Sequence, residues 1–181
     1  MGHRFGGTDT AEFTAMNPNQ TVPVIKDGNA QTLWESGAIL RYLAGQYGDD
    51  PFWPRDLQAR ANVDRWAEWS KLNIAIVFTG PVLWQVVRTP KEQQEQTRIK
   101  QAVAQLEHLL SIANAQLENR AYLAGDEFSL ADIQFRHVLY RYYTIPIARR
   151  PLPAVAQYYS RLAQRAAYKA HVMVSFDKLQ A

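Results

Sequence analysis

Apolar residues form two short runs within residues 21–34, whereas from Leu57 onward they recur every three to four positions. Residues 21–26 are rich in β-branched side chains, and residues 30–34 resume an apolar pattern after a short polar break. An Asp-Gly pair between two such runs is a strong hairpin signal, so we predict two strands joined by a tight turn. Either Asp27-Gly28 or Gly28-Asn29 can form the centre of that turn.

A helix is predicted directly after the hairpin. Ser36 stands at the expected N-cap, where its hydroxyl can accept a hydrogen bond from a free backbone N–H of the first turn. Gly48 follows the last apolar position, where a left-handed C-cap is expected. The apolar positions of this helix recur at helical spacing: Ile39, Leu40, Leu43 and Tyr47.

A polar segment punctuated by prolines, residues 49–54, marks the best domain boundary. We therefore predict one domain over residues 1–50 and a second over residues 57–181. From Leu57 onward the apolar period is three to four residues, which is typical of helices. Gly80-Pro81 should kink or end the first of these helices, and Thr89-Pro90 should begin the next.

Two apolar stripes define the core faces of these helices. The first contains Val63, Trp66, Ser70, Ile74 and Val77, opposite the polar residues Arg60, Asp64, Glu68 and Lys71. The second contains Ile99, Ala102, Leu106, Leu109, Ala113 and Leu117, after a first turn with the acids Glu92 and Glu95. Acidic residues in a first helical turn are favoured by the helix dipole.

A capping box is expected further along the chain. Ser129 is followed three residues later by Asp132, and Phe128 and Ile133 are placed to form a hydrophobic staple around this cap. Apolar positions continue at helical spacing to Tyr142, and further helices follow Pro151 and Pro153 and cover about residues 166–174. The second domain is therefore predicted to be all-helical.

Composition excludes several classes of protein. The 181 residues are 47% apolar and 20% charged, as in a soluble globular protein, and we see no apolar run long enough to predict a membrane span. The N-terminal residues show no basic-then-apolar signal pattern, so we do not expect export, and the absence of cysteine is compatible with a reducing cytoplasm. The four histidines (His3, His108, His137 and His171) lack metal-ligand spacing, so we predict no metal site. Dispersed arginines argue against nucleic acid.

The hairpin and the following helix together suggest a receptor for a small peptide. Pro23 indicates an edge strand, on which the backbone of Val22 is free to pair with an extended peptide. The helix beginning at Ser36 offers backbone N–H groups to a carboxylate, and Glu35 can hold an ammonium group beside it. The alternative interpretation is an ordinary edge proline, an ordinary cap and a solvated acid.

The chain resembles the glutathione transferase family, and most closely its bacterial members. The resemblance rests on two blocks: Asn17-Pro18-x-x-x-Val22-Pro23 with Glu35-Ser36-Gly37-Ala38-Ile39, and Phe128-Ser129-Leu130-Ala131-Asp132-Ile133. It covers the chain from about residue 13 to 172. It implies part of a thioredoxin-like glutathione-binding domain, followed by an all-α helical-bundle domain, usually in a cytoplasmic homodimer.

The resemblance also implies roles for individual residues. The peptide before Pro23 should be cis, and the backbone of Val22 should pair with the cysteinyl part of glutathione. Glu35 and Ser36 should bind its γ-glutamyl end, and Thr21 occupies the position that often reaches its glycine end. The small hydrophobic electrophile that is the second substrate should contact the start of the helical domain, at Trp66, Trp69, Asn73, Val77 and Trp84.

One part of the family pattern has no match in this sequence. The Tyr, Ser or Cys that stabilises the glutathione thiolate lies in a strand–helix unit that the matching region does not include, so the catalytic residue is unassigned. Thr8, Thr10 and Thr14 supply hydroxyls, but their spacing does not place one at the thiol. We expect one of three explanations for the unmatched strand–helix unit: it is truncated, it is omitted from the sequence, or another chain supplies it. The leading hypothesis is a transferase; the alternatives are a non-catalytic glutathione-binding or protein-interaction module and a glutathione-dependent reductase or isomerase.

Overall fold

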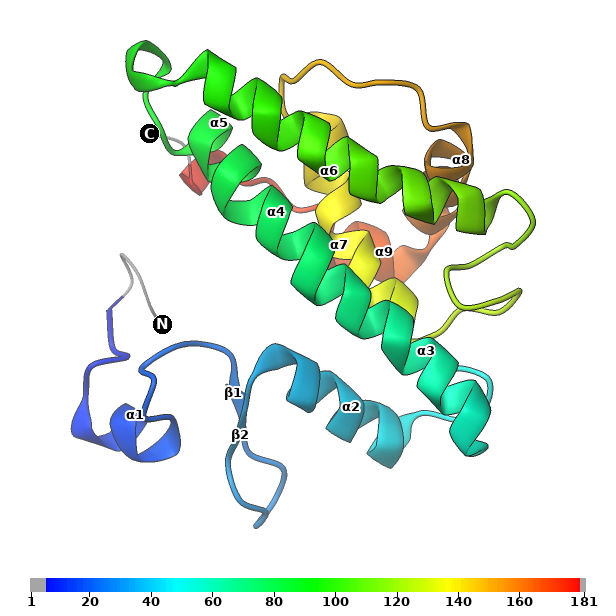
Figure 1. Ribbon diagram of the computed structural model, residues 1–181. Coiled ribbons are helices and arrows are strands. Elements are labelled where there is room, and N and C mark those ends of the chain that lie inside the picture. The colour runs from blue at the N-terminus through cyan, green and yellow to red at the C-terminus, as the bar shows by residue number, and fades with distance from the viewer. Residues whose placement is uncertain (1–5, 180–181) are drawn as a thin grey trace. The chain divides into compact units, whose positions relative to one another are not determined.

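The computed structural model describes residues 6–179, and the chain divides into two compact units, residues 1–53 and 54–181. The first unit contains α1 (Ala11–Met16), β1 (Val24–Ile25), β2 (Leu33–Trp34) and α2 (Ser36–Tyr47). In Figure 1 it runs from blue to cyan, whereas the second unit consists of helices and their connections. This composition agrees with the predicted fold class, a small α+β unit followed by an all-helical one.

The predicted hairpin is present, but its strands are short. β1 and β2 pair in antiparallel fashion, with Val24 opposite Trp34 and Ile25 opposite Leu33. The ladder does not extend back over residues 21–23, because Pro23 has no N–H to donate. The Ala30 N–H donates to the Asp27 carbonyl at 3.0 Å, and Gly28 has a φ of +56°. Gly28 and Asn29 therefore form the centre of the turn.

The ends of α2 differ from the prediction in two ways. The helix begins at Ser36 itself, because Glu35, with φ +70° and ψ 113°, lies outside the helical region and takes the N-cap position. At the other end Gly48 is extended (φ −98°) rather than left-handed. A Cβ at Gly48 would lie 2.6 Å from the Ala44 carbonyl oxygen and 2.9 Å from Phe52, so close packing rather than backbone handedness requires glycine there.

The second unit is built around one continuous helix, Leu57–Val87. It comprises α3 (Leu57–Trp69), α4 (Ile76–Phe78) and α5 (Gln85–Val87), which are joined by π-helical turns at Ser70–Ala75 and Thr79–Trp84. The predicted end at Gly80-Pro81 is therefore wrong. The proline falls inside the second π-helical segment, whose wider turns accommodate a residue that lacks a backbone N–H.

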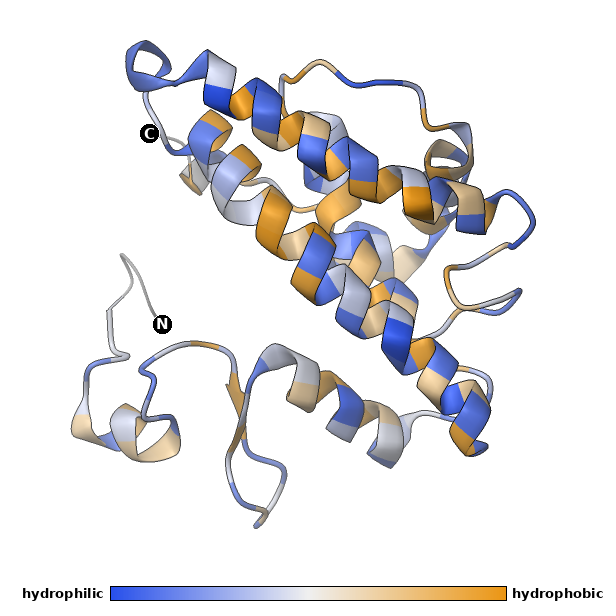
Figure 2. Ribbon diagram, in the orientation of Figure 1, coloured by the Kyte–Doolittle hydropathy of each residue, from blue (hydrophilic) through white to orange (hydrophobic). Residues whose placement is uncertain are grey.

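An 18-residue window of this helix has the length and composition of a membrane span, which our sequence reading missed. A core helix of a soluble protein passes the same test, and a third of the window is buried. Ile74, Phe78 and Val82 are at most 1% exposed, whereas Leu72, Ile76 and Trp84 are exposed. Figure 2 shows the resulting mixture of apolar and polar residues along the helix. We interpret it as a core helix.

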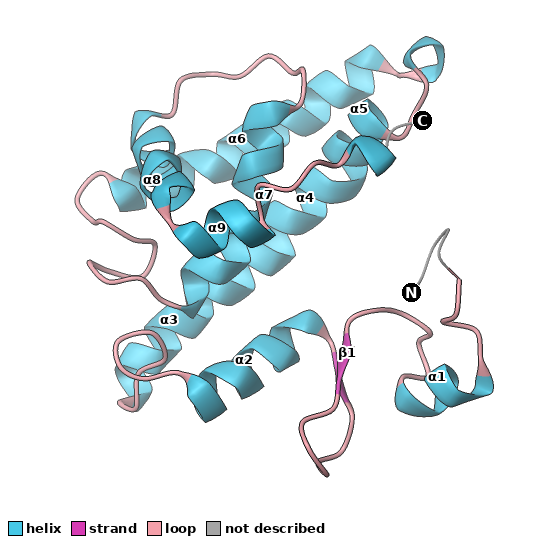
Figure 3. Cartoon of the chain, turned by 180° about the vertical axis from the view of Figure 1, so that it is seen from behind, coloured by secondary structure: helices cyan, strands magenta, loops and turns pink. Residues whose placement is uncertain are grey.

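The remaining helices enclose the core of the second unit. They are α6 (Gln96–Leu117), α7 (Leu130–Thr144), α8 (Pro153–Gln164) and α9 (Ala166–His171), with short 3₁₀ turns at Lys91–Gln93 and Asp177–Leu179. α7 packs against α3 and its π-helical continuation, and α8 packs against α6 and α7 (Figure 3). The aromatic side chains Phe135, Tyr142, Tyr158 and Tyr168 are almost fully buried.

The start of α6 was predicted too early. It begins at Gln96, so Glu92 lies in a 3₁₀ turn and Glu95 at the N-cap rather than in the first turn. The Gln94 amide donates to the carbonyls of Val86 (3.1 Å) and Thr89 (2.9 Å) and so holds this connection outside the helix. The predicted core stripe is otherwise present, with Leu110 buried in place of Leu109.

The predicted capping box is confirmed and forms part of a larger buried network. Ser129 caps α7, and the Asp132 carboxylate accepts hydrogen bonds from the Ser129 N–H (2.8 Å) and the Ser129 hydroxyl (3.1 Å). It also accepts from the Leu123 N–H at 3.1 Å and the Tyr158 hydroxyl at 2.7 Å. This one carboxylate thus ties the loop before α7 to α7 itself and to α8.

Replacing Asp132 should destabilise the helical unit. Asp132→Ala leaves buried donors without an acceptor, so we expect the free energy of unfolding to fall by about 2–4 kcal/mol. The measurement is urea denaturation followed by circular dichroism. Glu127→Ala, which removes an exposed acid from the same loop, is the matched control and should change stability by less than about 0.5 kcal/mol. Equal effects of the two substitutions would contradict the role of the network.

Candidate functional site

The hairpin brings the two predicted halves of the glutathione site to the same end of one small sheet. Because Val24 pairs with Trp34, the residues before β1 and those after β2 emerge side by side. The first group contains Thr21, Val22 and Pro23, and the second contains Glu35 and Ser36. Residues separated by more than ten positions in the sequence therefore border one surface.

The segment before β1 is exposed to solvent. The Val22–Pro23 peptide is cis, as the family resemblance implies, and the Val22 side chain is 52% exposed. Asn17 is 1% exposed, and its amide donates to the Thr21 carbonyl oxygen at 2.7 Å while its Oδ1 accepts from the Asn19 N–H at 3.0 Å. A buried amide thus positions the chain immediately before Val22.

The segment after β2 presents a helix N-terminus beside a carboxylate. The first intrahelical bond of α2 runs from the Ile39 N–H to the Glu35 carbonyl, and the side chain of the N-cap residue Glu35 does not cap the preceding N–H groups of Ser36, Gly37 and Ala38. Such N–H groups and the helix dipole favour an anion. Glu35 is exposed and has a positive φ, a conformation that non-glycine residues adopt rarely and often at functional sites.

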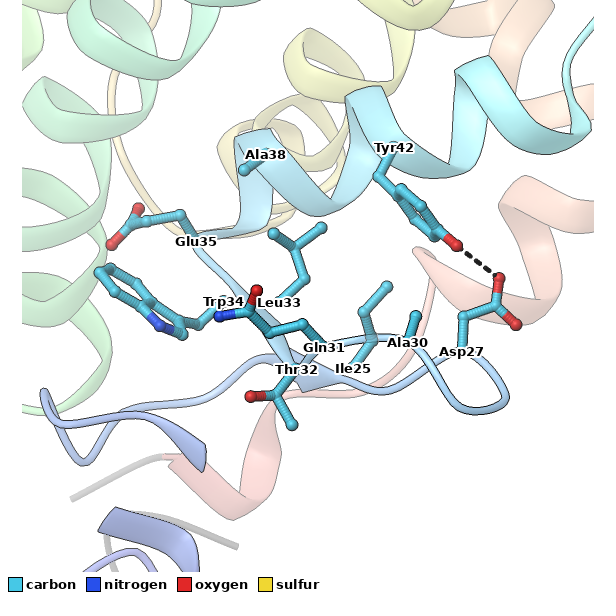
Figure 4. A pocket seen from close by; sticks show the side chains of 10 residues that line it. All are labelled: Ile25, Asp27, Ala30, Gln31, Thr32, Leu33, Trp34, Glu35, Ala38 and Tyr42. Carbon is cyan, nitrogen blue, oxygen red and sulfur yellow. Dashed lines mark hydrogen bonds between the residues drawn. The ribbon is translucent and has the colours of Figure 1, made fainter. Parts of the chain in front are cut away.

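A cavity of about 600 Å³ lies between the hairpin and α2. In Figure 4, Ile25, Leu33 and Ala38 form its apolar wall, and Glu35 stands at one end. Of the five predicted glutathione-binding residues, only Glu35 lines this cavity. The other four border the adjoining end of the hairpin.

The far end of this cavity is formed by an aspartate held by two phenols. The hydroxyls of Tyr42 and Tyr47 donate to the same carboxylate oxygen of Asp27, at 2.9 Å and 2.6 Å. The bond from Tyr47, followed by the bond from Tyr42, holds the pKa of Asp27 below its ordinary value. The same bonds raise the pKa of both phenols, because each phenol is a donor only while protonated. The tip of the hairpin is thereby fastened to α2.

The hydroxyls of the N-terminal threonines serve local structure. The Thr10 hydroxyl caps α1 by accepting from the Phe13 N–H at 3.2 Å. The Thr14 hydroxyl accepts from the Gln20 amide at 3.2 Å. Neither arrangement identifies a group that stabilises a thiolate. The catalytic position stays unassigned.

The five residues predicted for the second substrate all lie on the long helix, in different environments. Trp69 packs toward the core, with its ring 6.3 Å from Phe135 and 5.2 Å from Trp66. The Trp66 indole nitrogen is buried without a hydrogen-bond partner among the described residues. Asn73 and Val77 are half-buried, and Trp84 is 44% exposed beneath the Arg88 guanidinium. Their role in binding stays a prediction.

Within residues 6–179 no group of three His, Asp or Glu side chains is placed to hold a metal ion. His108, His137 and His171 lie on separate helices, and His3 lies outside the described residues.

Sequence reasoning missed two positioning residues, Asn17 and Asp27. Asp27 was predicted only as a turn residue, because Asp-Gly is a turn signal, and Asn17 was noted as part of an Asn-Pro turn signal and of the family motif, without a role of its own. The fold gives each an additional set of hydrogen-bond partners that the local pattern does not reveal.

Asn17→Ala should loosen the chain before Val22. The Thr21 carbonyl loses its part-buried hydrogen bond, so we expect a loss of about 1–2 kcal/mol and faster hydrogen exchange at residues 19–24. Asn19→Ala is the control, since Asn19 is exposed and its amide makes one bond, to Asn17 Oδ1. Exchange rates that match the wild type in Asn17→Ala would contradict the role assigned to this amide.

The pKa of Asp27 should respond to removal of either phenol. Tyr47→Phe should raise it toward the ordinary value of 3.8 by more than Tyr42→Phe does, because the Tyr47 bond contributes most. Since the folded-state pKa is lowered, these bonds stabilise the hairpin above that ordinary value, and the contribution is lost as the pH falls through the lowered pKa. Carbon-13 NMR titration of the carboxyl group measures the shift. An unchanged Asp27 pKa in both variants would refute the arrangement.

Comparisons with known proteins identify the family of the chain. Family models described as the N-terminal and C-terminal domains of glutathione S-transferase match residues 3–46 and 76–166. Glutathione S-transferase GstB of Escherichia coli K12 is 33% identical over 174 residues, which cover 96% of this chain and 83% of that protein. Human glutathione S-transferase theta-1 is 36% identical over 126 residues, covering 67% and 52% of the two chains.

A solved structure gives the same result. The theta-class glutathione S-transferase of Xanthomonas axonopodis pv. citri, determined with glutathione bound, is 41% identical, with a TM-score of 0.89. The match covers 96% of this chain and 83% of that one. The resemblance seen in the sequence and the predicted fold class are both confirmed. This chain belongs to the glutathione S-transferase family.

Proposed function

We propose that this protein binds glutathione and conjugates its thiolate to a small hydrophobic electrophile. The observation that carries the proposal is the N-terminus of α2. Its first N–H groups are not capped by the side chain of the N-cap residue Glu35, and the helix begins beside the exposed carboxylate of that residue. The relatives that share both halves of the chain are named glutathione S-transferases, and one was solved with glutathione bound.

The γ-glutamyl end of glutathione complements this arrangement. It carries an α-carboxylate and an α-ammonium on one carbon atom. The carboxylate suits the Ser36 hydroxyl and the N–H groups at the start of α2, and the ammonium suits Glu35. A zwitterion therefore satisfies both charges of the site at once, whereas a simple anion would be repelled by Glu35.

The segment before β1 suits the rest of the tripeptide. Val22 lies two residues before β1, whose second edge is unpaired among the described strands, so an extended peptide can add hydrogen bonds there. The bonds that Asn17 makes to Thr21 keep this backbone in place before the ligand arrives, which reduces the entropy cost of binding. Thr21 is then the nearest side chain for the glycine end.

Conjugation requires the sulfur as a thiolate. A free thiol has a pKa of about 8.5, so only a small fraction ionises at neutral pH without a stabilising donor. In the reaction the thiol gives up its proton, the thiolate forms a carbon–sulfur bond with the electrophile, and a leaving group such as halide departs with its bonding electrons. The residues assigned here bind and orient glutathione, and the group that stabilises the thiolate is unassigned.

The remaining parts of the proposal follow the family. Trp66, Trp69, Asn73, Val77 and Trp84 are the positions proposed to contact the electrophile. We further propose a homodimer in the cytoplasm, with no metal, membrane or nucleic acid as a partner.

Removing the two polar groups at α2 tests glutathione binding. Glu35→Gln and Ser36→Ala should each weaken glutathione binding by about tenfold, because each removes one charge-assisted contact worth about 1.5 kcal/mol. Isothermal calorimetry with glutathione measures the affinity. Glu12→Gln, an exposed acid on α1, is the control and should bind as the wild type does. Wild-type affinity in both site variants would contradict the assignment.

Turnover separates a transferase from a binding module. Conjugation of glutathione to an aromatic halide, followed by absorbance, should accompany binding if the protein is a transferase. Binding of glutathione without conjugation would favour the non-catalytic module.

A further inference from the structure

Two arginine side chains of the helical unit lie over the same aromatic ring. The Arg165 guanidinium carbon is 3.9 Å from the centre of the Phe128 ring, and the Arg136 guanidinium carbon is 5.7 Å from it. Phe128 and Arg136 belong to the start of α7, whereas Arg165 stands at the junction of α8 and α9, which follow one another directly (Figure 3). Segments that are far apart in the sequence therefore bring two positive charges to one ring.

Further contacts hold Arg136 in position. Its guanidinium carbon also lies 5.6 Å from the centre of the Tyr168 ring on α9. The Tyr168 hydroxyl donates to the Arg136 carbonyl oxygen at 2.9 Å and so ties α9 to α7 at this point. A contact with an aromatic ring leaves the five N–H donors of a guanidinium available to an acceptor.

Neither guanidinium has an acidic partner among the described residues. No acid there forms an ion pair with Arg136 or Arg165, and no acceptor takes a hydrogen bond from either group. Asp132 is the acid whose charge acts on Arg136, and its carboxylate already accepts four hydrogen bonds. The exposed acids of the loop before α7, Asp126 and Glu127, are paired with neither arginine.

The charge of Arg136 has lost part of its hydration without gaining a counterion, because the side chain is half-buried. This loss, followed by repulsion from Arg165, holds the pKa of Arg136 below its ordinary value. Arg161, four residues before Arg165, has another unmet donor. Its Nη2 donates to the Ala121 carbonyl oxygen at 2.7 Å, but its buried Nε has no partner among the described residues. Unmet donors and mutual repulsion both favour a bound anion.

We propose that Arg136 and Arg165 form a binding site for a phosphate-type oxyanion. A guanidinium fork donates to two oxygens of such an anion at once. Two unpaired positive charges favour a dianion over a carboxylate, which neutralises only one of them. The ring of Phe128 holds both forks before the anion arrives, so little side-chain freedom is lost on binding.

This oxyanion site is independent of the conjugation reaction. It lies wholly within the second unit and shares no residue with the positions proposed for glutathione or the electrophile. Its test therefore succeeds or fails separately from the test of the proposed function.

The probe is inorganic phosphate, titrated into the full chain at low, constant ionic strength and mildly alkaline pH, where phosphate is a dianion. Carbon-detected NMR of the arginine Cζ–Nε pairs reports on both guanidiniums. We expect the signals of Arg136 and Arg165 to shift with one common midpoint, and acetate to bind at least about threefold more weakly. Signals that stay unchanged, that move with different midpoints or that respond equally to acetate would overturn the proposal.

Matched variants locate the site. Arg165→Gln should raise the phosphate dissociation constant, followed at Arg136, at least about fivefold, because one of the two forks is lost. Arg150→Gln removes an exposed arginine of the α7–α8 connection with the same change in charge, and should raise the constant less than about twofold. Circular dichroism confirms that both variants are folded. Equal effects of the two substitutions would refute the assignment.

Phosphoserine distinguishes the sources of the phosphate group. Binding tighter than that of inorganic phosphate indicates an esterified phosphate, and weaker binding indicates the free ion. Both results support an oxyanion site, whatever the outcome of the conjugation assay.

Discussion

The pairing of β1 with β2 is the constraint on which the glutathione site depends. It consists of two residue pairs, Val24 with Trp34 and Ile25 with Leu33, and it places the cis peptide at Pro23 beside the start of α2. A shift of the register by one residue would exchange the faces of the strands and separate these two segments. The bonds from Tyr42 and Tyr47 to Asp27 secure the opposite end of the hairpin, so the register is held from both sides.

The helical unit depends on a different kind of constraint, a buried carboxylate shared by three segments. Asp132 receives donors from the loop before α7, from the start of α7 and from α8, so each segment fixes the others. A buried charge is tolerated because these donors replace the water it has lost. Arg149 and Glu107 act in the same way on the connection after α7. Arg149 donates to the Ile147 carbonyl and Glu107 accepts from the Arg150 N–H, so the connection is held against α6.

Most elements were predictable because their signals are local. The hairpin, α2, the capping box at Ser129 and the stripe of α6 each follow from residues within one or two turns of one another. The errors share a cause. Gly80-Pro81 was expected to kink or end the helix, but the helix continues through it in π-helical turns. Gln94 holds the residues before α6 in a separate connection through bonds to Val86 and Thr89. Both outcomes depend on contacts that no local pattern contains.

The sequence by itself determined which residues have the chemistry to hold glutathione, because an edge proline and a helix start beside an acid are properties of short segments. Only the tertiary structure decided that these segments meet at one end of a two-pair ladder, that Glu35 takes a positive φ, and that Asn17 supports Thr21. The physical reason is that spacing along a chain specifies periodicity, whereas proximity arises from long-range packing.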